Sequence, residues 1–422
     1  MVLFLLFQKK EHISLKSNIV VQKYGGTSIG DVEKLKLIAK KIVEKKLEGF
    51  SPVVVVSAMG KTTDELIEMS EKVTFSQTQP DLREKDTLLS TGELVSATLL
   101  AMSIKSLNQE VISLSGSQAG IFTDQIHGSA RISDINTKRI LKEIDQNKIL
   151  IIAGFQGVNT QGDITTLGRG GSDTTAVALA VALNATVCEI YTDVKGIYTT
   201  DPRIVSQARK IDFINYEDML EMAVLGAKMH PRSIELASVY NVPIYIAGTF
   251  SETKGTLIVK GENMENNKTV TGIAIDKNVS KITIKKIKND PGTAGSILKP
   301  LSDQSISIDI IVQNIPINGF IDFSFSISDH DIQRAYDILM GQENLDFEDI
   351  IKGSGFAKIS LVGTGMQNAP GYATEMFNAL GEENINIEMI TTSEIRITCL
   401  INEKDVNSAV NALHSKFELD KE

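Results

Sequence analysis

Aromatic residues, cysteine and excess positive charge are all scarce in this chain of 422 residues. Aromatic residues make up 5% of it, and tryptophan is absent. The two cysteines, Cys188 and Cys399, lie far apart, which excludes a disulfide scaffold and a zinc or redox motif. We therefore expect both to be buried, reduced thiols in a cytoplasmic protein. The formal net charge of −10 argues against a nucleic-acid-binding protein, which needs a basic surface.

Long hydrophobic runs are missing as well. The N-terminal stretch MVLFLLFQKK is too short to span a bilayer, which takes about 20 apolar residues, and it lacks the order of a signal peptide. We treat residues 1–18 as an N-terminal extension and expect no membrane segment. The five histidines have no spacing that suits a metal site, so we expect none. A hydrophobic content of 42% is ordinary for a globular protein with sizeable cores.

Short β-branched runs alternate with helical patterns between residues 19 and 258. Apolar strands spaced by helices indicate an α/β fold, with a mainly parallel sheet between layers of helices. Ligands bind such sheets beyond the carboxyl ends of the strands, where we expect the motifs below to gather. The predicted strands are 18–23, 51–57, 148–154 and 187–192, and the predicted helices are 32–48, 93–106 and 172–183.

An internal repeat occupies the C-terminal part of the chain. The pattern Pro-Gly-x-Ala at 291–294 recurs at 370–373, and the apolar residues that follow match at the same spacing. Each copy reads as strand, Pro-Gly turn, helix and strand, the start of a βαββαβ unit. We expect a first domain at 19–260, a polar linker at 261–270, and two repeats at 271–345 and 346–422.

A glycine-rich motif, KYGGTS at 23–28, follows the first predicted strand. Gly25 and Gly26 would let backbone N–H groups approach phosphate oxygens, and Lys23 would add a positive charge. The N-terminus of the next helix also favours negative charge. A tight turn without function is the alternative for this motif alone.

Two further motifs combine charged and polar groups. In LGRGGSD at 167–173, Arg169 can bind a carboxylate through two hydrogen bonds, while Ser172 or Asp173 suits a helix N-cap. The stretch YTDVKGIYTTDPR at 191–203 offers hydroxyls, carboxylates, rings and an arginine to a nucleotide. An ordinary polar turn is the alternative for the second stretch.

Two shorter motifs complete the set. SAMGKTT at 57–63 ends the second strand, and TGE at 91–93 is predicted to open a helix. Taken alone, Glu93 in a first helical turn would be a surface acid that the helix dipole favours.

Together these motifs resemble the aspartate kinases of the amino-acid kinase family, and the Pro-Gly repeat resembles their two ACT domains. The resemblance covers about residues 19–418. It implies an αβα amino-acid kinase fold followed by two ferredoxin-like βαββαβ ACT domains. It also implies transfer of the γ-phosphoryl of ATP, carried with Mg²⁺, to the side-chain carboxylate of L-aspartate, the first step of lysine, threonine and methionine biosynthesis. That carboxylate, with an ordinary pKa near 3.9, needs no general base.

The resemblance assigns roles to individual residues. Lys23 would neutralise the transferring phosphoryl group, and Asp173 would orient Lys23, so both are predicted to be catalytic. Arg169 would bind a carboxylate of the substrate and Glu93 its ammonium group. The predicted aspartate-binding residues are Ser57, Thr63, Glu93, Arg169 and Ser172. The predicted ATP-binding residues are Lys23, Tyr24, Gly25, Gly26, Thr192, Asp193, Tyr198, Asp201, Arg203 and Lys228, the last in a segment one residue shorter than the family pattern.

The ACT repeat implies feedback inhibition by lysine, threonine or both. The matching effector positions are Asn289, Asp290, Gly292, Ala294, Ile308 and Gln313 in the first copy, and Asn384, Asn386 and Ile387 in the second. We expect a homodimer or larger oligomer through these domains, and an ACT-only subunit started at Met264 is a further hypothesis. The alternatives are another amino-acid kinase, acting on glutamate or its N-acetyl derivative, and a catalytically silent amino-acid sensor.

Overall fold

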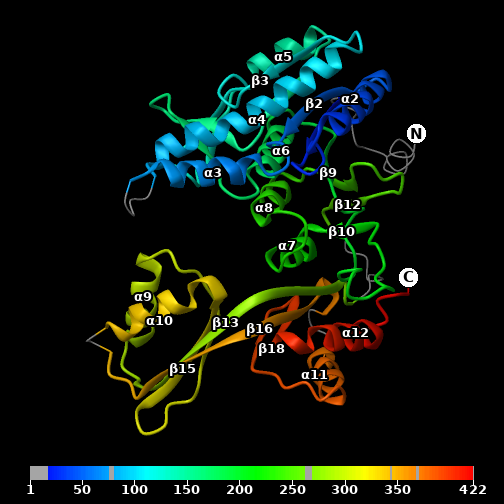
Figure 1. The fold of residues 1–422 in the computed structure, drawn as a ribbon. Coiled ribbons are helices and arrows are strands. Elements are labelled where there is room, and N and C mark those ends of the chain that lie inside the picture. Colours follow the sequence, from blue (N-terminus) through cyan, green and yellow to red (C-terminus); the bar gives the residue numbers. More distant parts are fainter. Residues whose placement is uncertain (1–17, 76–79, 262–268, 343–344, 367–369, 422) are drawn as a thin grey trace. The chain divides into compact units, whose positions relative to one another are not determined.

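The computed structural model describes residues 18–75, 80–261, 269–342, 345–366 and 370–421. The predicted extension except its last residue, most of the predicted linker, and Met264 lie outside the described residues. The chain divides into two compact units (Figure 1). The first combines residues up to 197 with 210–223 and 228–263, and the second combines 198–209, 224–227 and 264–422.

The first unit is built on an eight-stranded sheet in the order β10-β12-β11-β9-β1-β2-β6-β3. Its central strands are almost completely buried aliphatic runs, as the sequence predicts for strands covered on both faces. All described pairings in it are parallel except β11 with β12, which confirms the mainly parallel sheet. The strands are β1 (Ile19–Tyr24), β2 (Ser51–Val56), β3 (Val111–Leu114), β6 (Ile149–Ala153), β9 (Val187–Thr192), β10 (Phe213–Asn215), β11 (Ile244–Gly248) and β12 (Thr256–Val259).

Helices cover both faces of this sheet. Neighbouring side chains of a strand point to opposite faces. Tyr24 therefore packs into the core under α2 and α4, while Lys23 meets α6 on the other side. The helices are α2 (Val32–Leu47), α3 (Thr62–Val73), α4 (Leu82–Lys105), α5 (Lys138–Asp145), α6 (Gly171–Ala182), α7 (Tyr216–Val224) and α8 (Pro231–Tyr240).

Helix α4 differs from the prediction because it begins at Leu82, so Glu93 lies in its middle and the predicted start at TGE is wrong. The cap is Asp81, whose side chain accepts a hydrogen bond from the backbone N–H of Glu84 (3.1 Å). Gly92 serves close packing instead, since a Cβ atom there would lie 2.9 Å from the Cβ of Ala58. Among the described helices, α4 alone is long and apolar enough to cross a membrane, and half of that stretch is buried inside the protein.

A second, four-stranded sheet in the order β5-β4-β7-β8 leads the chain into the 167–173 motif. Asp86 of α4 fastens this sheet, because its carboxylate accepts hydrogen bonds from the backbone N–H of Gly128 and the hydroxyl of Thr166, and pairs with His127. The strands are β4 (Ile121–Thr123), β5 (Ile132–Ile135), β7 (Gln156–Val158) and β8 (Ile164–Thr166).

The second unit holds a six-stranded antiparallel sheet in the order β14-β15-β13-β16-β18-β17. The long strands β13 (Gly272–Lys288) and β16 (Asp349–Val362) pair along its middle (Figure 1). Both copies of the repeat show the predicted order of strand, Pro-Gly turn, helix and strand. The other elements are α9 (Thr293–Asp303), β14 (Ile308–Gln313), β15 (Phe320–Ser328), α10 (Ile332–Met340), α11 (Tyr372–Glu382), β17 (Met389–Thr392), β18 (Arg396–Asn402) and α12 (Val406–Lys416).

The two repeats share their central strands. Ile350, at the start of β16, packs into the core of the first repeat, whereas Ile273, at the start of β13, packs into the core of the second. The first part of β13 pairs with the last part of β16, so the second repeat takes its fourth strand from upstream in the chain. The repeats are therefore interlocked rather than strictly sequential. The predicted buried state of both cysteines is confirmed, and both thiols are free.

Candidate active site

The turns that follow neighbouring strands of the large sheet are joined to one another. The backbone N–H of Gly25, after β1, donates to the carbonyl of Tyr191 at the end of β9 (3.3 Å). The N–H of Gly60, after β2, donates to the carbonyl of Gly26 (3.0 Å). A Cβ atom on Gly26 would lie 2.7 Å from the carbonyl oxygen of Ala58, so this close approach requires glycine. Three of the predicted motifs thus meet at the carboxyl edge of the sheet.

Lys23 and Asp173 form an ion pair in which Nζ and Oδ1 are 2.6 Å apart. Lys23 lies near the end of β1 and Asp173 in the first turn of α6. The two side chains are only 12% and 13% exposed, so water screens their interaction weakly. The contact predicted between these residues is confirmed, while their catalytic role stays a prediction.

Glu93 is buried, being only 3% exposed, so the alternative of a surface acid is wrong. Its Oε1 accepts a hydrogen bond from the backbone N–H of Ala58 (3.1 Å). Its Oε2 has no hydrogen-bond partner among the described residues. Burial raises the pKa of this carboxyl to about 7. A buried acid with one open oxygen suits a cationic group such as an ammonium ion.

The 167–173 motif forms a glycine loop that presents Arg169. Gly168 and Gly170 have φ values of 74° and 68°, in the left-handed region that favours glycine. Arg169 is exposed and has no ion pair within the described part of the chain. Ser172 is buried, and a Cβ atom on Gly154, after β6, would lie 3.0 Å from its Oγ.

One expectation about helix ends is wrong, and the other stays a prediction. Gly170, rather than Ser172 or Asp173, caps α6, because the left-handed glycine makes the turn and Asp173 is engaged by Lys23. The N-terminus of α2 already holds the carboxylate of Asp31, which accepts a hydrogen bond from the N–H of Lys34 (2.8 Å). That hydrogen bond lowers the pKa of Asp31. One N–H group of the first turn of α2 therefore has a partner within the protein, and the attraction of this helix end for phosphate stays a prediction.

Some of the side chains predicted to bind the nucleotide lie at the same edge of the sheet, but the side chain of Tyr24 is turned into the core. Lys228 pairs with Asp193 (3.2 Å) just beyond β9. Partial burial alone would raise the pKa of Asp193, but hydrogen bonds from Lys228 and Thr192 lower it below its ordinary value. The ring of Tyr24 is instead buried and stacks on Tyr191 with centroids 4.9 Å apart, so only its backbone can face a ligand.

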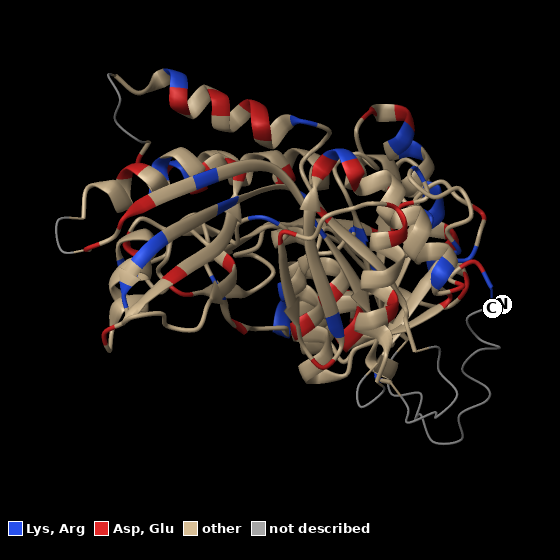
Figure 2. Cartoon of the chain, turned by 90° about the horizontal axis from the view of Figure 1, so that it is seen from below, with Lys and Arg blue, Asp and Glu red and all other residues tan. Residues whose placement is uncertain are grey.

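The remaining predicted substrate and nucleotide residues fall into two groups. Ser57 and Thr63 are half-buried on either side of the turn that joins β2 to α3. Tyr198, Asp201 and Arg203 lie in segment 198–209 of the second unit, where Arg203 and Asp201 pair with each other (2.6 Å). Both signs of charge are spread over both units (Figure 2). The described residues contain no group of three or more His, Cys, Asp or Glu that could hold a metal ion.

The predicted effector residues lie at the turns of the repeats. In the first copy they flank the start of α9 and the two ends of β14, and in the second they connect α11 to β17. The second copy also has a cavity of about 260 Å³ between its Pro-Gly turn, at 370–373, and the β17–β18 turn, at 392–394. Asn384, Asn386 and Ile387 do not line it.

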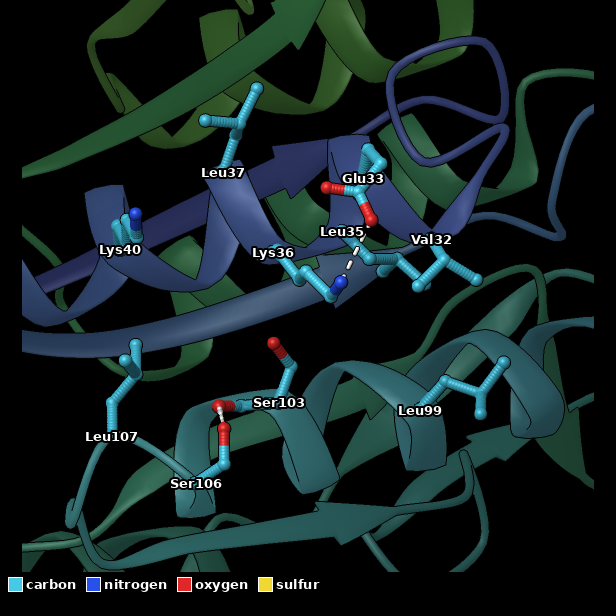
Figure 3. Close-up of a pocket in the computed structure, with 10 residues that line it drawn as sticks. All are labelled: Val32, Glu33, Leu35, Lys36, Leu37, Lys40, Leu99, Ser103, Ser106 and Leu107. Carbon is cyan, nitrogen blue, oxygen red and sulfur yellow. Dashed lines mark hydrogen bonds and ion pairs between the residues drawn. The ribbon is translucent and has the colours of Figure 1, made fainter.

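A larger cavity of about 400 Å³ lies between α2 and α4 (Figure 3). Leucine side chains from both helices and the side chains of Lys36 and Lys40 surround it. None of the predicted site residues lines this cavity.

Sequence reasoning missed three residues that support the glycine loop: Phe155, His230 and Arg232. Phe155 has a φ of 69°, which is rare for a bulky side chain and has no signature in the sequence. The tripeptide His-Pro-Arg at 230–232 was a weak signal, because proline at the first position of a helix marks only where α8 begins.

Sequence comparison places this arrangement among known proteins. The amino acid kinase family model matches residues 18–248, and an ACT domain model matches residues 359–417. The aspartokinase of Geobacillus stearothermophilus is 45% identical over 405 residues, which are 96% of this chain and 98% of that protein. The aspartokinase of Corynebacterium glutamicum is 46% identical over 408 residues, or 95% and 96% of the two chains.

A solved structure has a similar fold over nearly the whole chain. E. coli aspartokinase III in complex with aspartate and ADP is 25% identical and has a TM-score of 0.78, covering 94% of this chain and 99% of that one. The same enzyme in complex with lysine and aspartate has a TM-score of 0.77 at 25% identity, covering 95% and 100%.

Proposed function

The chain belongs to the aspartokinases of the amino acid kinase family, and we propose how its residues bind the substrates and transfer the phosphoryl group. The enzyme is a phosphotransferase that moves the γ-phosphoryl of ATP to the side-chain carboxylate of L-aspartate, giving 4-phospho-L-aspartate. The observation that supports the proposal best is the largely shielded Lys23–Asp173 ion pair at the edge where the motif turns meet.

Two charged groups hold aspartate. The open Oε2 of Glu93 receives the substrate ammonium, which provides the partner that this oxygen lacks within the described residues. Arg169 binds a carboxylate through two parallel hydrogen bonds, because its guanidinium is exposed and engages no acid of the described chain. Ser57, Thr63 and Ser172 complete the pocket. Together these groups match the three charges of a dicarboxylic amino acid.

Catalysis then needs positioning and charge neutralisation rather than a base. The attacking carboxylate is already ionised near neutral pH. Lys23, held by Asp173, neutralises charge on the transferring phosphoryl group, and the N–H of Gly26 faces its oxygens, whereas the N–H of Gly25 is already engaged by the carbonyl of Tyr191. When bound, Mg²⁺ further neutralises the phosphate oxygens. The described chain offers no cage of three acidic or histidine ligands, which suits an ion held chiefly by ATP, with Asp173 near its waters.

The nucleotide lies beyond β9. Thr192, Asp193 and Lys228 offer a hydroxyl, a carboxylate and a cation within one hydrogen-bonded group. Lys228 is half exposed, so it can turn from Asp193 toward a phosphate. E. coli aspartokinase III binds ADP and aspartate, which supports a nucleotide site in the same fold.

The second unit regulates the enzyme through its ACT domains. We propose lysine, threonine or both as inhibitors, bound at the Pro-Gly turns, and a homodimer or larger oligomer formed by the ACT domains. E. coli aspartokinase III forms a T-state complex with lysine, which supports this class of effector.

Steady-state kinetics with both substrates varied tests the assignments. Arg169→Ala should raise KM for aspartate by about 10- to 150-fold, since it removes a charge-assisted pair worth about 1.5–3 kcal/mol, with KM for ATP nearly unchanged. Lys228→Ala should show the opposite pattern. If Arg169→Ala raised KM for ATP and left KM for aspartate unchanged, the proposed orientation of the two substrates would be wrong.

A further inference from the structure

We propose that Arg232 is a positioning residue for aspartate binding: with His230, it fixes the glycine loop so that the guanidinium of Arg169 is held ready for the substrate carboxylate. The inference rests on the proposed role of Arg169 and extends it to α8, which contributes no residue to the pocket. It is carried by contacts on both sides of the loop.

Arg232 joins two loops through their backbone carbonyls. Its Nη1 donates to the carbonyl of Leu167 (3.3 Å), and its Nη2 donates to the carbonyl of Ala130 (3.0 Å). Leu167 lies two residues before Arg169, so this hydrogen bond fixes the entry to the glycine loop. The N–H of Ala130 in turn donates to the carbonyl of Thr166 (2.9 Å), which fastens the two loops to each other.

The guanidinium of Arg232 donates to backbone carbonyls rather than to an acidic side chain. Arg232 is partly buried and forms no ion pair with a carboxylate within the described residues. Burial and the nearby charge of Arg131 lower the pKa of Arg232 by more than the charges of Asp124 and Glu235 raise it. An exposed arginine would avoid the effect of burial. The hydrogen bonds to the two carbonyls are what the chain gains from placing a guanidinium there.

The other side of the loop is closed by side chains in direct contact with it. A Cβ atom on Gly170 would lie 2.3 Å from the Cβ of His230, so the imidazole presses against the loop next to Arg169. A Cβ atom on Gly171 would lie 2.8 Å from a ring carbon of Phe155. Phe155 keeps its left-handed backbone while donating its N–H to the hydroxyl of Thr175 (3.1 Å) and accepting the N–H of Leu167 (2.9 Å).

The physical need for such support follows from the glycines. Three glycines surround Arg169, and glycine leaves a backbone more conformational freedom than any other residue. A guanidinium on a free loop would have to be ordered at each binding event, which weakens binding. The contacts to Arg232, His230 and Phe155 order the loop in advance. Arg232 thus affects substrate binding through the position of Arg169 rather than by touching the substrate.

The test is a double-mutant cycle in the full-length protein, with both KM values and kcat measured. Arg232→Met keeps much of the side-chain length but removes every donor. We expect it to raise KM for aspartate by about 10- to 100-fold, since a misplacement of about 1 Å can cost about 100-fold. KM for ATP should change less than twofold. Arg139→Met, which removes an exposed arginine from α5, is the matched control and should change neither KM.

The double variant Arg169→Ala/Arg232→Met decides between positioning and direct contact. If Arg232 acts through Arg169, the double variant has the KM for aspartate of Arg169→Ala alone. If Arg232→Met still raises that KM tenfold in the Arg169→Ala background, Arg232 binds the substrate itself and the inference is overturned. If Arg169→Ala alone leaves KM for aspartate unchanged, the proposed role of Arg169 fails and the inference falls with it.

A second variant keeps the inference testable if Arg232→Met does not fold. Gly170→Ala pushes the loop away from His230, so it should produce the same selective rise in KM for aspartate. Thermal unfolding of each variant establishes that it is folded at the assay temperature. An unchanged KM for aspartate in folded Arg232→Met or folded Gly170→Ala would overturn the inference.

Discussion

Lys23 is the residue on which phosphoryl transfer depends most. Its ammonium group is held by Asp173, and the motif at 23–28 contains no other cationic residue. We expect Lys23→Ala to lower kcat at least 100-fold, since transition-state charge would lose its fixed counter-charge. Lys36→Ala, which breaks an exposed pair with Glu33 on α2, is the control and should keep full activity. Near wild-type kcat in folded Lys23→Ala protein would refute the catalytic role.

Glu93 should make aspartate binding sensitive to pH. Burial raises its pKa to about 7, so the carboxyl is neutral below that pH and no longer attracts an ammonium group. KM for aspartate should therefore rise as the pH falls from 8 to 6, and this rise should be absent in Glu93→Gln. A pH profile identical in the two proteins would contradict the ammonium-binding role. Glu143→Gln on α5, which alters an acid paired with Lys148, is the control.

The same carboxyl should also lower the stability of the fold at alkaline pH. Its folded-state pKa lies above the ordinary value of 4.5, so the folded protein binds the extra proton and loses stability as the pH rises from 4.5 to about 7. Glu93→Gln removes that buried charge. We expect its free energy of unfolding at pH 8 to exceed that of the wild type by at most about 3 kcal/mol. Urea unfolding of both proteins at pH 6 and pH 8 measures the difference.

At the residue scale, the sequence predicted which charged side chains pair with each other, but not how deeply the site residues are buried. The motifs placed Lys23 and Asp173 together because a strand end and a helix start meet at one sheet edge. The burial of Glu93 was missed, because helix propensity alone cannot show that α4 continues upstream of Gly92. Arg232 was missed since its partners are backbone carbonyls, which leave no trace in a sequence.

At the scale of elements, the contact between α4 and the end of β2 sets the position of Glu93. Gly92→Ala would favour an isolated helix by about 1 kcal/mol, yet here the new Cβ would overlap that of Ala58, 2.9 Å away. We expect this substitution to destabilise the protein by about 1–3 kcal/mol and to raise KM for aspartate, as α4 is forced away from β2.

The compensating substitution distinguishes this overlap from a general effect. Ala58→Gly removes the opposing Cβ, so Gly92→Ala/Ala58→Gly should regain most of the stability and most of the aspartate affinity. Thermal unfolding and KM for aspartate of the four proteins provide the measurement. If the double variant were as impaired as Gly92→Ala, close packing would not be the reason for this glycine.

The elements of the large sheet were largely predictable, and the interlocking of the repeats was not. Runs such as Val53–Val56 and Ile149–Ala153 are too apolar for any exposed position, so they predict buried parallel strands. The repeat gave each copy its correct order of elements. It could not show that β13 and β16 serve both cores, because similarity between copies is local and strand sharing depends on pairing across the chain.

At the scale of the molecule, the shared strands predict that the two ACT repeats respond together. We expect lysine, threonine or both to inhibit the initial rate, and Asp290→Ala to raise the inhibitor concentration needed by about 10- to 150-fold, since it removes a charged partner worth about 1.5–3 kcal/mol. kcat without inhibitor should not change, because Asp290 lies at the turn before α9. Absence of any effect of either amino acid, alone or combined, would leave the repeats a purely structural role.

The most direct measurement of the central claim is trapping of the acyl phosphate with hydroxylamine. Full-length protein is incubated with ATP, Mg²⁺ and one of L-aspartate, L-glutamate or N-acetyl-L-glutamate, and hydroxamate formation is followed over time. We predict hydroxamate from aspartate alone, and its loss in Lys23→Ala protein. Hydroxamate formed preferentially from glutamate or N-acetylglutamate, or none from any of the three, would contradict the account.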